Sequence, residues 1–155
     1  MQKEWPLLLL SWYDENKRQL PWREQTDAYR TWVSEIMLQQ TRVEAVKDYY
    51  RRFLERFPAL EDLAAATEEE VLQQWQGLGY YSRARNLWQG ARETVSQYGG
   101  KVPKDEKKLR TLPGVGEYTA GAILSIAYQQ AVPAVDGNVL RVFSRLYGLQ
   151  EDVQT

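Results

Sequence analysis

The sequence predicts an all-α fold, and three observations carry that prediction. Apolar residues recur with the 3.6-residue period of a helix, and no segment shows the sustained alternation of a half-buried strand. Capping residues, prolines and glycines divide the chain into ordinary helical lengths. With 155 residues the chain fits one domain with a real core, and six Trp, ten Tyr and three Phe supply bulk for it. Aromatic rings of this kind also stack on nucleic-acid bases.

The apolar spacing predicts helices over residues 7–19, 27–39, 44–57, 60–65, 68–76, 82–98, 104–111, 117–128 and 137–147. The first ends at the turn around Pro21, and Thr26 or Asp27 caps the second. The third has a clear helical period and is ended by Pro58. The fifth carries a capping box, with Thr67 at its start and a glutamate three residues later.

Glycines divide the second half of the chain. Gly99 and Gly100 end the helix over 82–98, and Leu112-Pro113-Gly114-Val115-Gly116 predicts a tight turn between the next two helices. Glycine tolerates the positive φ of such a turn. Its exposed N–H groups at the positive end of the following helix suit a phosphate. A plain turn between helices explains the isolated motif equally well.

Composition excludes several kinds of chemistry. The chain contains no Cys and no His, so it offers no thiolate or imidazole for a metal and no histidine catalyst. Acid–base work falls to Asp, Glu, Lys or Tyr. The beginning of the sequence shows no signal peptide, and the leucine run over 7–10 is too short to cross a membrane. We expect a soluble intracellular protein that does not bind membranes.

The net charge of −1 hides an uneven distribution. Residues 44–79 hold four Lys/Arg against eight Asp/Glu, whereas residues 80–110 hold eight Lys/Arg against three acids. A basic segment leading into the glycine turn suggests an electrostatic footprint on DNA. A solvated helix face is the competing interpretation.

Two carboxylates are candidates for catalysis. Glu35 lies at the edge of the apolar arc of a helix that we expect to be buried, so partial desolvation should raise its pKa toward that of a general acid. A salt-bridged surface glutamate is the alternative. Asp136 directly precedes a helix and makes a good N-cap, which alone explains it. Capping also keeps such a carboxylate ionised, and one protonated and one ionised acid suit the cleavage of a glycosidic bond.

These residues coincide with the motifs of a known family. The chain resembles the helix-hairpin-helix DNA glycosylase superfamily and, within it, the adenine DNA glycosylases of the MutY kind. Besides the glycine turn, the resemblance covers Leu20-Pro21-Trp22-Arg23, Val33-Ser34-Glu35-Ile36-Met37-Leu38-Gln39-Gln40-Thr41, Gly77-Leu78-Gly79-Tyr80-Tyr81-Ser82-Arg83 and Val135-Asp136-Gly137-Asn138.

The resemblance implies a helix-hairpin-helix glycosylase fold. Residues 24–134 would form a six-helix barrel with Glu35 and the hairpin, and residues 1–23 and 135–155 would contribute to an incomplete second helical domain. Family members of full length continue into a segment with a [4Fe-4S] cluster and a further domain that recognises 8-oxoguanine. This chain stops before both, so the resemblance implies no cofactor held by its own residues. A monovalent cation at the hairpin is left open.

The resemblance also implies roles for individual residues in removing adenine opposite 8-oxoguanine or guanine. Glu35 would protonate the flipped adenine and Asp136 would stabilise the cationic sugar, with Tyr118 and Asn138 supporting the same site. The adenine pocket would use Arg18, Leu20, Trp22, Arg23 and Leu38. DNA contacts would come from Gln39, Gln40, Thr41, Leu78, Gly79, Tyr80, Arg83, Leu112, Gly114, Val115 and Gly116.

Bifunctional relatives carry a lysine where this chain has Tyr118, so the resemblance implies a monofunctional enzyme without strand cleavage. The expected partner is double-stranded DNA with the mispair, bound by a monomer in a bacterial-type cytoplasm at the nucleoid. Core packing remains the alternative for Leu78. Two other functions stay open: a DNA-binding hairpin module without catalysis, and a glycosylase of the superfamily for another lesion.

Overall fold

The computed structural model describes residues 4–150, which are helical with no strand among them, as the sequence predicts. Its elements in chain order are α1 (Trp5–Asn16), the 3₁₀ turn η1 (Pro21–Arg23), α2 (Ala28–Leu38), α3 (Val43–Arg56), α4 (Leu60–Ala65), α5 (Glu68–Trp75), α6 (Ser82–Tyr98), α7 (Glu106–Thr111), α8 (Glu117–Ala122), the π-helical turn η2 (Ile123–Ala127) and α9 (Gly137–Tyr147). Among these described helices, none is long and apolar enough to pass through a bilayer.

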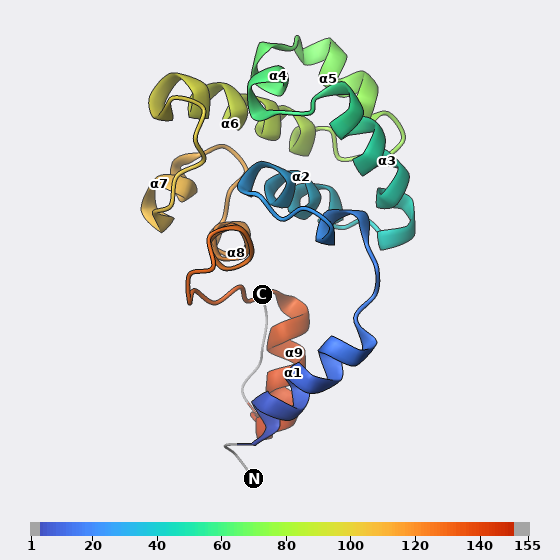
Figure 1. Ribbon diagram of the computed structural model, residues 1–155, viewed down its shortest axis with the longest axis vertical. Coiled ribbons are helices and arrows are strands. Elements are labelled where there is room, and N and C mark those ends of the chain that lie inside the picture. Colours follow the sequence, from blue (N-terminus) through green and yellow to red (C-terminus); the bar gives the residue numbers. More distant parts are fainter. Residues whose placement is uncertain (1–3, 151–155) are drawn as a thin grey trace.

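Helix α2 lies in the middle of the body formed by α2–α8 (Figure 1). It packs against α3, α6, α8 and η2, and it buries Trp32, Val33 and Met37 completely. Asp27 starts the helix, since its Oδ1 accepts a hydrogen bond from the Arg30 N–H at 3.0 Å. The helix that carries Glu35 is therefore anchored on several sides.

Aromatic side chains fill the core beside α2. Phe53 meets Phe57 and Trp75 edge to face, with ring centroids 5.1 and 6.0 Å apart, and all three are fully buried. The predicted capping box of α5 is present: Thr67 accepts a hydrogen bond from the Glu70 N–H at 3.2 Å, and the Glu70 carboxylate accepts one from the Thr67 N–H at 2.8 Å. Local signals and packing agree in this part of the chain.

The glycine turn joins α7 to α8 as predicted, but its two glycines differ in backbone conformation and in their surroundings. Gly114 has φ +74°, and a Cβ there would lie 2.9 Å from the Asn86 Cβ. Gly116 has φ −92° and ψ −172°, an extended conformation that any residue adopts, and a Cβ would meet nothing within 4 Å. The expectation of a positive φ is therefore wrong for Gly116, which lies at the N-cap of α8.

The predicted helix over 117–128 is present to Ala127, but its second half is π-helical. The α-helical pattern ends at Ala122, and the chain continues as the π turn η2, in which the Tyr128 N–H donates to the Ile123 carbonyl at 3.3 Å. The chain then folds back against α8 so closely that a Cβ on Gly121 would lie 2.2 Å from the Pro133 carbonyl oxygen. Gly121 is required by this close approach of two backbones.

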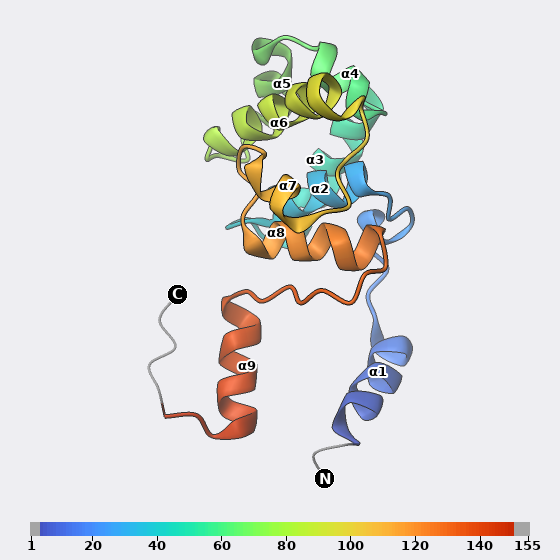
Figure 2. The same cartoon turned by 90° about the vertical axis from the view of Figure 1, so that its left-hand side faces the viewer.

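Helices α1 and α9 stand apart from the body and form what we call the terminal pair (Figure 2). Neither has a buried residue, and Trp5 of α1 meets Phe143 of α9 edge to face at 5.7 Å. Leu20 and Trp22, which precede the predicted boundary at residue 24, are buried with the core side chains of the body. Trp22 packs edge to face on Tyr50 at 5.7 Å. Residues 1–3 and 151–155 of the predicted second domain lie outside the described residues.

Candidate active site

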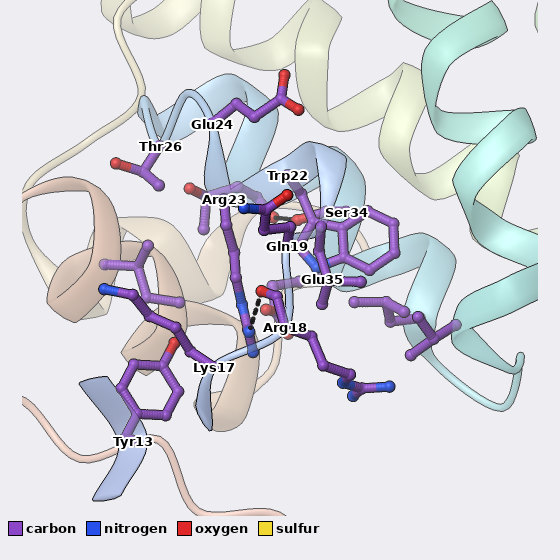
Figure 3. A pocket seen from close by; sticks show the side chains of 15 residues that line it. Tyr13, Lys17, Arg18, Gln19, Trp22, Arg23, Glu24, Thr26, Ser34 and Glu35 are labelled. Carbon is purple, nitrogen blue, oxygen red and sulfur yellow. Dashed lines mark hydrogen bonds between the residues drawn. The ribbon is translucent and has the colours of Figure 1, made fainter. Parts of the chain in front are cut away.

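A cavity of about 690 Å³ opens where α1, η1, α2 and η2 meet (Figure 3). This volume is in the range of sites for small molecules and single bases. The side chains that line it are Tyr13, Lys17, Arg18, Gln19, Leu20, Trp22, Arg23, Glu24, Thr26, Thr31, Ser34, Glu35, Leu38, Val43 and Ile126. All five predicted pocket residues and Glu35 are among them.

The predicted pocket residues divide into apolar walls and a polar rim. Leu20 and Trp22 are buried in the core and present their apolar surfaces to the cavity. Arg18 and Arg23 are exposed at the opening, where Arg23 Nη1 donates to the Arg18 carbonyl at 3.0 Å (Figure 3). An apolar slot with cationic groups at its mouth suits a planar, uncharged ring joined to an anionic chain.

Tyr13 of α1 and Lys17, which directly follows the helix, line the cavity and were missed by sequence reasoning. The ring of Tyr13 lies under two cations, with the Arg23 guanidinium 5.5 Å and the Lys17 ammonium 6.0 Å from its centroid. Helical periodicity identifies the residues on one face of a helix without showing which neighbour that face meets. The basic and aromatic residues directly before Leu20 were the available signal.

Glu35 combines burial with two polar neighbours. Burial raises the pKa of its carboxyl, a hydrogen bond from the side chain of Tyr118 lowers it, and the negative charge of Asp136 raises it. The net direction is upward, as the sequence predicts, because desolvation disfavours the ionised form most strongly. A raised pKa lets a carboxylic acid beside a cavity hold its proton to higher pH than a free glutamate does, as a general acid requires.

Asp136 is held at the start of α9 by hydrogen bonds. Its Oδ1 accepts a hydrogen bond from the Val139 N–H at 2.8 Å, which confirms the predicted N-cap of α9. The Asn138 side-chain amide lies 3.4 Å from Oδ2, and Arg141 in turn donates to the Asn138 oxygen at 2.9 Å. These contacts fix the orientation of the carboxylate next to Glu35 and Tyr118.

Tyr118 connects the two acids. Burial raises the pKa of its hydroxyl, and the nearby charges of Glu35 and Asp136 raise it further, so the group stays protonated. A protonated phenol can donate to Glu35, and it cannot act as an amine nucleophile. The predicted catalytic residues Glu35, Tyr118, Asp136 and Asn138 thus form one connected group from α2, α8 and the start of α9.

The residues predicted to contact DNA separate into exposed and buried sets. Gln40 and Tyr80 are exposed, and both have positive φ, +56° and +49°. Leu78 is buried in the core, in line with its alternative interpretation. The side chains of Leu112 and Val115 are also buried, which leaves their backbones as the groups that could contact a ligand.

Three polar residues of the predicted DNA surface bind within the protein. Arg83 is 9% exposed and donates to carbonyls of α2, so its guanidinium is engaged within the protein. Thr41 Oγ1 accepts from Arg83 Nη2 at 3.1 Å, and the Gln39 amide lies 3.4 Å from Thr119 Oγ1. Charge is visible in a sequence, whereas burial of that charge depends on distant contacts.

The chain offers no donor set for the iron–sulfur cluster of the family it resembles. Such a cluster is held by cysteine thiolates, and the sequence contains no cysteine. Residues 4–150 hold no group of three or more acidic side chains placed to bind a metal ion.

Comparison with known proteins points in one direction. A family model described as "HhH-GPD superfamily base excision DNA repair protein" matches residues 33–155. Proteins named adenine DNA glycosylase from Rattus norvegicus and Homo sapiens are 55% and 52% identical over 93% of this chain. The chain spans only 30% and 28% of their lengths.

Solved structures show the same likeness. A thermostable thymine-DNA glycosylase superposes with a TM-score of 0.81 at 32% identity, over 87% of this chain and 63% of that one. A trapped endonuclease III–DNA covalent intermediate superposes with a TM-score of 0.80 at 27% identity, over 93% of this chain and 67% of the other.

Proposed function

Because the chain belongs to the HhH-GPD superfamily of base excision DNA repair proteins, we propose that it removes adenine mispaired with 8-oxoguanine or guanine by hydrolysing the N-glycosidic bond. The observation that carries this proposal is Glu35, an acid with a raised pKa in a cavity lined by an apolar slot, with Asp136 close by. The names of the similar rat and human proteins support adenine as the base.

The reaction needs the base outside the helix, because neither carboxylate could reach it in a stacked duplex. The flipped adenine would enter the slot between Leu20, Trp22 and Leu38. The phosphates that flank its nucleotide would lie toward the arginines of the rim. Gln40 and Tyr80, both exposed, would fill the space left in the duplex. Stacking of an aromatic ring on bases offsets part of the cost of extrusion.

Glu35 would give its proton to N7 of the adenine, which turns the base into a neutral leaving group. As the bond between C1′ and N9 breaks, positive charge develops on the sugar, and the Asp136 carboxylate would stabilise it. Water then adds at C1′ and returns a proton to Glu35. Tyr118 would orient both acids, and since it is no amine, the sugar would not be held as a Schiff base.

The test is a single-turnover reaction on a duplex with one adenine opposite 8-oxoguanine, followed by alkaline cleavage of the abasic product. We expect product from the chain of 155 residues, and no strand cleavage before alkali. Glu35→Gln and Asp136→Asn should each lower the rate by roughly 100- to 10,000-fold, the usual contribution of such groups. Glu55→Gln, at an exposed position on α3, is the matched control and should keep the full rate.

Three outcomes would count against the proposal. No product at high enzyme concentration would mean that this chain does not catalyse the reaction. Salt-sensitive DNA binding, unchanged in Glu35→Gln and without release of adenine, would favour a binding module. Release of thymine from a mispair, with adenine untouched, would favour another lesion, as in the similar thymine-DNA glycosylase.

A further inference from the structure

Arg83 makes an unusual set of contacts for a cation. Its Nη1 donates to the carbonyls of Ile36 at 2.9 Å and Met37 at 3.1 Å, and also to that of Gln39. These carbonyls lie at the C-terminal end of α2, where the helix dipole is negative. The guanidinium therefore caps the helix that carries Glu35.

The same guanidinium reaches the loop before α6. Its Nη2 donates to the Gly79 carbonyl at 3.3 Å, and the group lies 5.5 Å from the ring centroid of Trp75 and 5.6 Å from that of Tyr80. One rigid fork thus joins the segment 36–41 to the segment 79–80. A guanidinium can do this because its donors are fixed in one plane, whereas an ammonium has a single nitrogen.

The two segments that Arg83 joins carry strained residues. Gln40 and Tyr80 adopt left-handed backbone conformations, although neither is a glycine. Such conformations persist only when surrounding contacts determine them, and they gather at functional sites. The side chain of Tyr80 is 62% exposed, so burial of that side chain cannot explain why its backbone is strained.

No carboxylate balances the charge of Arg83. The ion pairs among residues 4–150 do not include it, and its Nε is buried without a hydrogen-bond partner. Burying a cation on carbonyl dipoles alone is costly. The contacts of Arg83 cost stability, and they fix the segments that carry Gln40 and Tyr80. The placement of these two exposed residues therefore explains the contacts better than a gain in stability does.

We propose that Arg83 is a positioning residue that locks Gln40 and Tyr80 into one pair, at a fixed place relative to α2, so that both enter the duplex around the mispair together. This inference rests on the proposed function, and it gives Arg83 no contact with DNA. It assigns to Arg83 the discrimination between a mispaired and a fully paired duplex.

The experiment compares Arg83→Gln and Arg83→Lys in a Glu35→Gln background, which prevents turnover. Fluorescence anisotropy gives the affinity for a duplex with adenine opposite 8-oxoguanine and for the same duplex fully paired. We expect both variants to lose at least tenfold in the ratio of the two affinities and to keep the affinity for paired DNA within about twofold. Lysine should not rescue the ratio, because it keeps the charge without the fork.

Hydrogen exchange supplies a readout that needs no DNA. Amides of 37–42 and 78–83 should exchange faster in both Arg83 variants, while those of α4 stay protected. The control is Arg56→Gln, which removes an exposed 2.6 Å ion pair with Glu70 between α3 and α5 and should change neither readout.

Two results would overturn the proposal. An affinity for both duplexes that falls in Arg83→Gln, with a smaller salt dependence, and is restored by lysine would make Arg83 a phosphate contact. Unchanged exchange in either segment, or a lower melting temperature with an unchanged affinity ratio, would leave Arg83 a purely structural residue. A parent chain that binds both duplexes equally would count against the proposed function instead, and the exchange data would still decide whether Arg83 holds the two segments.

Discussion

At the scale of single residues, Glu35 is set by three neighbours that act in opposite directions. Burial and the charge of Asp136 favour its protonated form, whereas the hydrogen bond from Tyr118 favours the ionised form. The balance makes Glu35 an acid whose pKa can be moved either way by a single substitution. The rate of a reaction that needs the protonated acid falls as the pH rises through this pKa.

Tyr118→Phe should move that fall to higher pH. The substitution removes the hydrogen bond that stabilises the Glu35 carboxylate, so the pKa of Glu35 rises and the protonated form persists further into the alkaline range. The measurement is the single-turnover excision rate between about pH 5 and 9, and the midpoint of the alkaline limb is the readout. Tyr128→Phe is the control. It removes a partly buried hydroxyl that donates to the Val102 carbonyl, and it should leave the midpoint of the alkaline limb unchanged. A midpoint that falls in Tyr118→Phe would contradict this account of Glu35.

Sequence reasoning singled out Glu35 and Asp136, but it did not predict that Arg83 forms hydrogen bonds within the protein. A carboxylate on an apolar helix and a carboxylate before a helix are local patterns that made Glu35 and Asp136 candidates, and the family resemblance supplied their expected roles. Arg83 lies in a basic segment, and charge counting therefore assigned it to DNA. Its hydrogen bonds to Ile36, Met37, Gln39 and Thr41 join residues 42 to 47 positions apart, which no local pattern reports.

At the scale of elements, helix ends follow from residues beside them. Pro58 follows the end of α3 and Thr67 caps α5, and both were readable from the sequence. The change from α8 to the π turn at Ile123 has no proline or glycine beside it. Near this change the returning chain at Pro133 packs closely against Gly121 of α8. The apolar period of the sequence does not reveal that contact.

Thr67→Ala should lower the free energy of unfolding by about 1 kcal/mol, since it removes the hydroxyl that accepts from the Glu70 N–H. Urea denaturation followed by circular dichroism measures the change. Ser96→Ala, which removes an exposed hydroxyl bonded to the Glu93 carbonyl within α6, is the matched control and should stay within about 0.5 kcal/mol. Equal losses in the two variants would show that the capping box contributes nothing particular.

At the scale of the whole molecule, most of the exposed large hydrophobic side chains among residues 4–150 lie on the terminal pair. Leu7, Leu8 and Trp12 of α1 are 70%, 68% and 59% exposed, and α9 exposes Val142 and Leu146. Contiguous apolar surface of this kind does not contribute burial energy to the fold. Burial of apolar side chains therefore stabilises the described residues mainly through the body formed by α2–α8.

Replacing Leu8 and Leu9 together by glutamine should raise solubility and change the free energy of unfolding by less than about 0.5 kcal/mol, as for surface positions in general. Leu63→Ala, at a fully buried position of α4, should cost roughly 2 to 5 kcal/mol. Thermal and urea unfolding measure both variants. A large loss in the leucine pair would show that α1 packs in solution on a surface that it leaves open here.

The attachment of Asp136 to α9 couples the orientation of its carboxylate to the position of that helix. One acid is embedded in the rigid barrel, and the other is clamped to the first turn of a helix that stands outside it. Because the carboxylate is tied to the Val139 N–H, any tilt of α9 turns the acid with it. A displacement of α9, even one that begins at its far end, would therefore change the orientation of the Asp136 carboxylate relative to Glu35.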